Sequence, residues 1–486
     1  SVVAALEGSL EHEPSPERRA ALHYYAGEAY ERTGELPDAV RHFVEAGRGG
    51  FHAAHALGAA VRMAAAAGLP EAHAEGLELL VEATTGRARS QALHALARLH
   101  RGPLDQPQRA VELLRDLLQL SPTDTTVIEE LRDLLGSLER TEEGSAVLLA
   151  GIAHHRSWLR AGNPDALDSG PLEGLRRLFG AVHDASGVYL TACVLEALSP
   201  DDGLEPGTRP DDFQAERWPL PSAQEGRPLE AIAADLDQSG ALDLLREGAY
   251  YFGKLPFDPT AWPPRISDAL PANNAVVMVA QSLARALGLP TPLVFFDDAV
   301  DGGVKTSLEP APCLMVGRRV AANPADPNVR DTLGRALFRL ATGGDAVHEH
   351  TTDEQLVTLV LALCHATGQD VDHLLEIDRF KDAFDPALAT ALAANLPAEE
   401  SLEDLVDFAR AFASNGDRFH PSRLRAGFTA GQDRAGAASA GDPRPALAIG
   451  LAEGPLVRVR ALISYLVSDD HLNLRRALGY HLGDAP

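Results

Sequence analysis

The feature that most constrains the fold is a pattern of small and aromatic residues that recurs in the first third of the chain. The segment AGEAYERTGELPDAVRHFVEA carries Gly-x2-Tyr, a further glycine and then Ala-x3-Phe-x2-Ala, at Gly27, Tyr30, Gly34, Ala39, Phe43 and Ala46. Small side chains let two helices cross closely, and aromatic rings fill the space between them. Because one such hairpin cannot bury its apolar face alone, the pattern predicts that several hairpins stack on one another.

Two further segments repeat parts of this pattern. RAVELLRDLLQLSP places Ala110 at a second-helix position and Pro122 just after that helix, and HALGAAVRMAAAAGLPEAHAEGLELL lies between the two copies, with Gly58 and Gly68. The spacing resembles the tetratricopeptide (TPR) repeat, and four hairpins fit residues 1–160. The resemblance implies an α-solenoid whose concave face binds peptides or partner proteins and which performs no chemistry of its own. The alternative is a chance match within Ala-rich helical hairpins.

The composition changes after this region. Residues 161–227 contain two segments rich in Pro, Gly and Asp, AGNPDALDSGP and SPDDGLEPGTRPDDFQAERWPLPSAQEGRP, and the apolar stretch Leu172–Leu198 lies between them. Pro, Gly and Asp favour turns and loops. We therefore expect a linker with one apolar helix and a long loop, which separates a repeat domain, 1–160, from a second domain, 228–486.

Helical periodicity returns from residue 228 and is interrupted by one cluster of short strands. PLVFFDD (292–298), GVKTSLEP (303–310) and PCLMVGR (312–318) are apolar or alternating runs separated by turn residues, as in a small sheet. The period of the remaining sequence predicts helices at about 229–245, 274–287, 326–342, 352–367, 370–379, 385–395, 401–414, 420–439, 443–452, 456–468 and 470–480. The predicted fold is mainly α: a TPR-like α-solenoid followed by a helix-rich α+β domain with a small sheet.

The order of strands and helices in the second domain resembles that of zincin metallopeptidases of the CAAX-protease and HtpX type. In these enzymes a helix after the strands bears H-E-x-x-H, whose two histidines bind zinc and whose Glu is the general base, and a later helix supplies a third ligand. The corresponding segments are LGRALFRL (333–340) and GFTAGQDRAG (427–436). With its repeats, the chain also resembles large TPR proteins of gliding, GC-rich bacteria that end in degenerate peptidase-like domains.

All four functional positions of the zincin motif are replaced in this sequence. The two histidine positions hold Arg335 and Arg339, the general-base position holds Ala336, and the third-ligand position holds Thr429. Guanidinium groups repel a cation, and alanine cannot take a proton from water. The resemblance therefore implies a pseudoenzyme, a scaffold without metal or cofactor. The alternative is a helical domain that contains L-G-x-x-L-x-x-L by chance.

Two arrangements are open for Arg335 and Arg339, because an unpaired buried guanidinium is too costly to persist. Either both arginines reach solvent, or an acidic residue such as Asp433, on the later helix, pairs with them. A weaker idea is that the two arginines bind an anion. The opposing hypothesis of function is an active metal-dependent hydrolase with a non-standard site around His348 and His350, which flank Glu349 in GGDAVHEHTTDEQ.

Charge and cysteine usage narrow the classes of partner. The chain has 43 basic and 70 acidic residues and a formal net charge of −27, which disfavours nucleic acid and anionic membrane surfaces as partners. Apolar runs such as Leu359–Cys364 are far too short to span a membrane. The three cysteines are widely spaced and form no disulfide framework, so we expect a cytoplasmic protein. Because the segment before His12 already has a helical pattern, we also expect a piece of a longer polypeptide.

Overall fold

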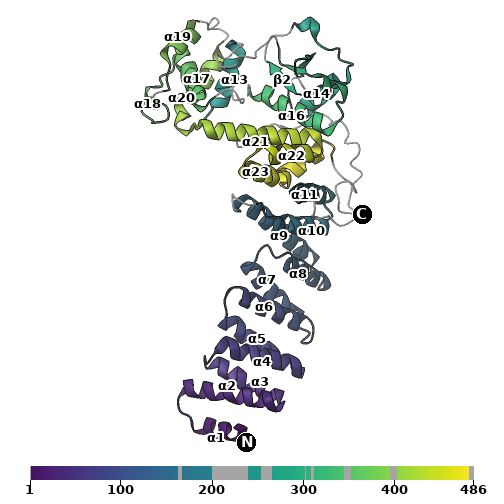
Figure 1. Ribbon diagram of the computed structural model, residues 1–486, viewed down its shortest axis with the longest axis vertical. Helices are drawn as coiled ribbons and strands as arrows, with labels where there is room; N and C mark the ends of the chain where they lie inside the picture. The colour runs from purple at the N-terminus through teal and green to yellow at the C-terminus, as the bar shows by residue number, and fades with distance from the viewer. Residues whose placement is uncertain are drawn as a thin grey trace. The chain divides into compact units, whose positions relative to one another are not determined.

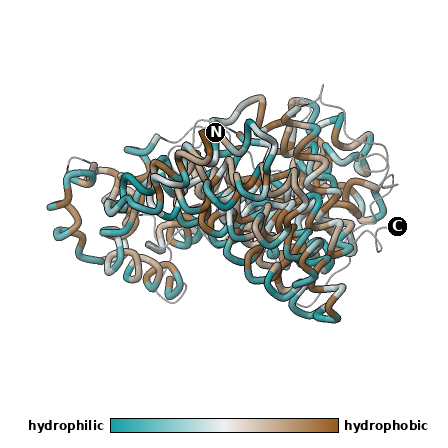
Figure 2. Tube along the Cα trace, turned by 90° about the horizontal axis from the view of Figure 1, so that it is seen from below, coloured by the Kyte–Doolittle hydropathy of each residue, from teal (hydrophilic) through white to brown (hydrophobic). Residues whose placement is uncertain are grey.

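In the computed structural model, the chain forms two compact units, Ser1–His155 and Arg156–Pro486, which we describe separately. The structure describes residues 2–162, 167–199, 232, 239–252, 265–289, 291–300, 303–307, 311–343, 352–381, 383–394 and 402–480. Along the helices, hydrophobic and hydrophilic residues alternate in short stretches (Figure 2). The chain is mainly α, as the sequence predicts.

The first unit is a row of antiparallel helices in which each helix packs on the next along the chain (Figure 1). Its helices, the last of which continues into the second unit, are α1 (Val2–His12), α2 (Pro16–Thr33), α3 (Leu36–Arg48), α4 (Ala53–Ala67), α5 (Pro70–Ala83), α6 (Gly86–Arg101), α7 (Pro107–Leu120), α8 (Thr125–Ser137) and α9 (Thr141–Ala161). Four hairpins, α2–α3 to α8–α9, follow α1.

Local signals in the sequence set the ends of these helices. Ser15 and Asp124 cap α2 and α8, because their side chains accept hydrogen bonds from backbone N–H groups of the first turn. Gly34 and Gly68 end α2 and α4 with φ angles of 80° and 64°, which glycine adopts without strain. Buried leucines and alanines of α5 to α8 form one continuous core, so each hairpin is stabilised by its neighbours.

The second unit combines one three-stranded sheet, among the described residues, with many helices. Strands β1 (Leu293–Phe296), β2 (Val304–Ser307) and β3 (Cys313–Val316) lie in the order β1-β3-β2, with β1 parallel and β2 antiparallel to β3. All three strands were predicted. The helices are α10 (Gly170–Ala181), α11 (Ala185–Leu198), α13 (Ala241–Phe252), α14 (Ala275–Ala286), α15 (Arg318–Ala322), α16 (Pro327–Thr342), α17 (Asp353–Ala366), α18 (Asp372–Leu375), α19 (Pro386–Ala394), α20 (Glu403–Asn415), α21 (Pro421–Ala440), α22 (Arg444–Glu453), α23 (Leu456–Leu466) and α24 (Asp469–Ala477).

The prediction of a single apolar helix between 161 and 227 is wrong. The stretch Leu172–Leu198 forms a hairpin of two helices, α10 and α11, and α11 packs on α22 of the second unit. The chain turns at His183, whose φ is 58°, and Asp184 then caps α11 by accepting a hydrogen bond from the Gly187 N–H. The ring of Phe179 fits against Gly187, where any Cβ would meet ring carbons within 2.7 Å.

Among the described helices of the second unit, α16 and α21 pack on each other most extensively, and they run antiparallel. Glycines on both helices allow a close approach, since a Cβ at Gly334 would clash with Ser439 and one at Gly431 would clash with the Phe338 ring. Helix α16 also packs on β2 and β3, so it lies between the sheet and α21. The two helices that carry the motif positions are therefore direct neighbours.

Candidate functional site

The repeat residues identified in the sequence lie where α2 and α3 meet. A Cβ at Gly27 would lie 2.9 Å from carbons of the Phe43 ring, so only glycine accommodates the ring at this distance. Ala39 and Ala46 are fully buried, and Tyr30 stacks on the His42 ring and donates a hydrogen bond to Glu7 of α1. In the α6–α8 region, Ala110 is buried in the core, and Pro122 is half-buried in the connection between α7 and α8.

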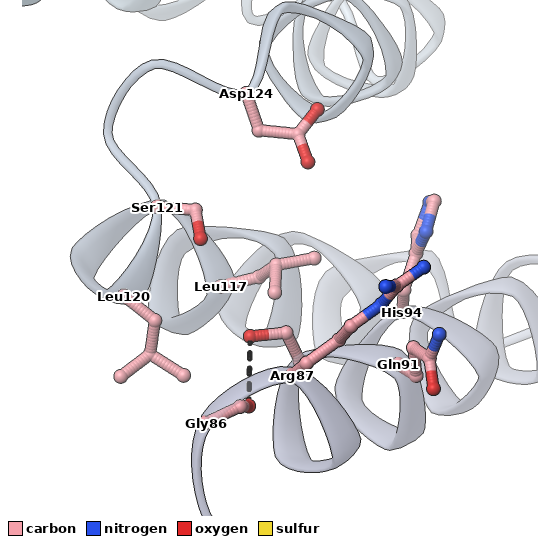
Figure 3. A pocket seen from close by; sticks show the side chains of 9 residues that line it. Gly86, Arg87, Gln91, His94, Leu117, Leu120, Ser121 and Asp124 are labelled. Atoms are coloured by element: carbon pink, nitrogen blue, oxygen red, sulfur yellow. Dashed lines mark hydrogen bonds between the residues drawn. The ribbon is translucent and has the colours of Figure 1, made fainter.

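Two cavities flank α6 in this unit and together form a groove along it. One has a volume of about 550 Å³ and lies between the first half of α6 and the end of α7 (Figure 3). The other has about 450 Å³ and lies between the second half of α6 and α5. Gln91 and His94 line both cavities. We call this feature the α6 groove.

One face of α6 supplies the polar side chains of the groove. Arg87, Gln91, His94 and Arg98 follow one another at intervals of four, three and four residues. At about 100° per residue, they fall within about 60° around the helix axis and form a single stripe. The helix carries four arginines and no acidic residue, and two of these arginines, Arg87 and Arg98, belong to this stripe.

The walls of the α6 groove differ in character at its two ends. Leu117 and Leu120 of α7 give the larger cavity an apolar side, and Ser121 and Asp124 close it at the start of α8. In Figure 3, Arg87 extends along α6 toward His94, and Asp124 lies across the cavity from it. Asp124 is engaged with α8, since its carboxylate accepts hydrogen bonds from the N–H groups of Thr126 and Val127.

A carboxylate of α8 fixes two side chains of the stripe. One oxygen of Glu130 lies 2.7 Å from Nε2 of His94, and the other accepts a hydrogen bond of 2.8 Å from Arg98. Partial burial acts to raise the pKa of Glu130, but the hydrogen bonds from Arg98 and His94 outweigh it and lower the pKa. Glu130 is therefore a stable anion that orients His94 and Arg98. For Arg87, no carboxylate lies within ion-pair distance among the residues that the structure describes.

The motif positions of the second unit lie on α16 and α21 and are occupied by structural contacts. Arg335 donates hydrogen bonds to Asp331, at 2.6 Å, and to Asp433 of α21, at 2.5 Å. Arg458 of α23 donates two more to Asp433, at 2.7 and 2.8 Å. We call Asp331, Arg335, Asp433 and Arg458 the Asp433 cross-tie. It is the second of the two arrangements expected from the sequence for Arg335.

The Asp433 cross-tie combines two carboxyl groups and two guanidinium groups, and burial raises the pKa of Asp331 although Arg335 acts to lower it. Burial acts to lower the pKa of Arg335, but Asp331 and Asp433 more than compensate and raise it, so the guanidinium remains charged. Asp331 and Asp433 are almost completely buried. Such a group is held by its partners, because an uncompensated charge at this depth would be strongly destabilising.

The other motif positions also differ from a metal site. Arg339 donates a hydrogen bond of 2.7 Å to the carbonyl of Val304 in β2. Ala336 is part of the apolar core, and the hydroxyl of Thr429 donates to the carbonyl of Arg425 on its own helix. His348 and His350 lie outside the described residues. Within the described ranges, no three His, Cys, Asp or Glu side chains are placed to hold a metal ion.

Comparison with solved structures finds partial matches of low similarity. No family model matches the chain, and no curated protein matches it. YrrB, described as a TPR protein with an unusual peptide-binding site, is 14% identical over 41% of this chain and 94% of its own, with a TM-score of 0.24. Pseudomonas aeruginosa pilF is 18% identical over 43% of this chain and 91% of its own, with a TM-score of 0.22. Because these identities and TM-scores are low, the evidence for a repeat architecture is the packing of successive helices within this chain itself.

The α6 groove was not predicted from the sequence. None of its polar residues Arg87, Gln91, His94 and Arg98 is among the candidate site residues given above. A signal was nevertheless present, because residues 86–101 contain four arginines and no acid, with polar residues at helical spacing.

Among the helices that the structure describes, none has the length and apolar character that a membrane span requires.

Proposed function

We propose that this protein is a non-catalytic interaction protein that binds a peptide segment of a protein partner in the α6 groove. The observation that carries the proposal is the pair of cavities that share Gln91 and His94 along one helix of a repeat array. Helical repeats present extended surfaces of this kind to extended ligands. The groove joins polar side chains of α6 to apolar walls from α7, a combination that suits a peptide with both kinds of side chain.

A steric block at Gln91 tests this proposal. Gln91 is exposed and lies between the two cavities, so Gln91→Trp should fill the groove without disturbing the core. A display library of random twelve-residue peptides is selected on the full wild-type chain, and the selected peptides are titrated against both proteins. We expect at least a tenfold loss of affinity in Gln91→Trp, with an unchanged circular dichroism spectrum and melting temperature.

The matched control places the same bulky residue outside the groove. Glu112→Trp on α7 changes an exposed residue whose partner is Arg109 on the same helix, and it should bind the selected peptides as the wild type does. Equal affinity for Gln91→Trp and wild type would refute the groove as the binding site. Failure to select any peptide would also count against the proposal.

We further propose that the second unit is a degenerate metallopeptidase-like domain that has kept the contact between its two motif helices. The direct packing of α16 on α21 and the bond between Arg335 and Asp433 favour this. On this proposal, a salt bridge now joins the helices that a metal ion would join in an active zincin. Purified protein should then contain less than stoichiometric zinc. One zinc per chain that is lost with hydrolytic activity in His348→Ala would favour the active-hydrolase alternative instead.

A further inference from the structure

The charge of the α6 groove indicates which peptides it selects. Helix α6 bears four arginines and no acid, whereas the preceding helix α5 bears Glu71, Glu75, Glu78 and Glu82 and no basic residue other than His73. Charges separated by more than a Debye length of about 8 Å are largely screened at physiological ionic strength. A ligand in the groove therefore experiences the charged side chains in and beside it more strongly than the distant net charge of the chain. These are Arg87, Arg98, Asp124 and Glu130, and Glu130 already pairs with Arg98, whereas Arg87 has no carboxylate partner among the described residues.

Two arginines of the stripe are placed to bind separate groups. Arg87 and Arg98 are 11 residues apart on one helix, which corresponds to about 16 Å along the axis and about 20° around it. Arg98 remains 64% exposed although it donates to Glu130, and Arg87 is exposed beside the larger cavity. Since an extended peptide advances about 3.3 Å per residue, groups four to six residues apart along it can reach both guanidinium groups.

We propose that the α6 groove binds an extended acidic peptide, in which one carboxylate pairs with Arg87 and a second, four to six residues away, pairs with Arg98. The inference rests on the proposed peptide-binding function and adds the chemical class of the ligand. Guanidinium groups bind carboxylates through two parallel hydrogen bonds, which neutral side chains cannot offer. Gln91, between the two arginines, can donate to and accept from the peptide backbone. An apolar side chain of the ligand then fits against Leu117 and Leu120.

A substitution of Arg87 tests the contribution of its positive charge to peptide binding without altering the fold. It has no ion pair within the described ranges, so Arg87→Gln removes only a group available to the ligand. The library selected on the full chain should be enriched in Asp and Glu, with pairs of acids four to six residues apart. A selected peptide should bind Arg87→Gln roughly tenfold more weakly, the usual effect of losing a charge-assisted hydrogen bond. Its affinity for the wild type should also fall as salt is raised.

The outcomes separate this inference from the proposed function. In a double-mutant cycle, replacing the first peptide Glu by Gln should weaken binding to wild type but have little further effect on Arg87→Gln. Arg109→Gln, at an exposed arginine of α7, is the charge control and should leave affinity unchanged. Two results would overturn the acidic-ligand inference and leave peptide binding intact. In the first, Gln91→Trp blocks the selected peptides but these peptides lack acidic residues. In the second, Gln91→Trp blocks them but Arg87→Gln binds them as tightly as the wild type does. If both variants bind the selected peptides as tightly as the wild type does, the acidic-ligand inference and the proposed binding site are both wrong.

Discussion

Replacing Asp433 by alanine removes the carboxylate at the centre of the Asp433 cross-tie, which connects α16, α21 and α23. Three hydrogen bonds of 2.5, 2.7 and 2.8 Å are lost, and Arg335 and Arg458 remain with side chains only 13% and 19% exposed. Removing one partner of a buried ion pair costs about 3–5 kcal/mol, because the remaining charge stays buried. Arg335 keeps Asp331 as a partner, so we expect a loss near the lower limit, about 3 kcal/mol.

The free energy of unfolding is measured by urea denaturation of the full chain, followed by a probe in the second unit. A fluorine label on Tyr465 or Tyr480, both buried in the second unit, reports its transition. The control is Asp407→Ala, which breaks an exposed pair with Arg410 on the surface of α20. That change should cost less than about 1 kcal/mol, as exposed ion pairs do.

A double variant sharpens the test. Asp433→Ala combined with Arg335→Ala should cost less than the sum of the two single changes, because the second substitution removes a guanidinium that the first left without one of its partners. If Asp433→Ala destabilises the second unit no more than Asp407→Ala does, the cross-tie does not hold α16 against α21. Strict additivity in the double variant would refute the direct coupling between the two side chains.

Three further outcomes follow from the same contacts. Gly27→Leu should destabilise the first unit by about 1–3 kcal/mol in urea denaturation through overpacking against Phe43, whereas Gly8→Leu, at an open position of α1, should not; equal effects would refute the packing. Restoring the motif with Arg335→His, Ala336→Glu, Arg339→His and Thr429→Glu should create zinc affinity by calorimetry, and a folded variant that binds no more zinc than wild type would remove the zincin ancestry. His471 is fully buried and its pKa lies well below the usual 6.5, because burial and Arg475 disfavour its charged form. His471 takes up a proton at a higher pH in the unfolded chain than in the folded chain, so the free energy of unfolding of the second unit should fall as the pH drops below 6.5. His471→Leu should reduce the dependence of this free energy on pH, and an identical pH dependence in both proteins would exclude His471 as its source.

Much of the secondary structure could be predicted because its signals are local. The strands were bounded by Gly, Pro and Asp, and the helix predicted at about 352–367 is α17, at whose start the structure contains a capping box of Thr352 and Gln355. The break between α10 and α11 was missed because every residue from Ala185 to Leu195 is buried. A helix that is buried on all sides has no polar face, so the apolar run Leu172–Leu198 resembles one element. The local signal of the break is the cap Asp184, which follows His183.

The candidate site could be predicted only in part, since it depends on contacts between distant segments. The pair of Arg335 and Asp433 was one of two expected arrangements, because both residues lay on helices already assigned to one motif. The α6 groove brings together Arg87 and His94 with Leu117 of α7 and Asp124 before α8. No local pattern encodes a cavity between these segments, because its volume depends on how neighbouring hairpins pack.

Hydrogen–deuterium exchange of the full chain, with and without the tightest selected peptide, tests most directly whether this protein acts by binding in the α6 groove. We expect slower exchange on binding in α6, residues 86–101, and in the segment 117–124 at the end of α7. Helices α16 and α21, which carry the replaced motif positions, should exchange at the same rate in both states. Protection confined to α16 and α21, or to repeat helices other than α5 to α8, would contradict the proposed binding site.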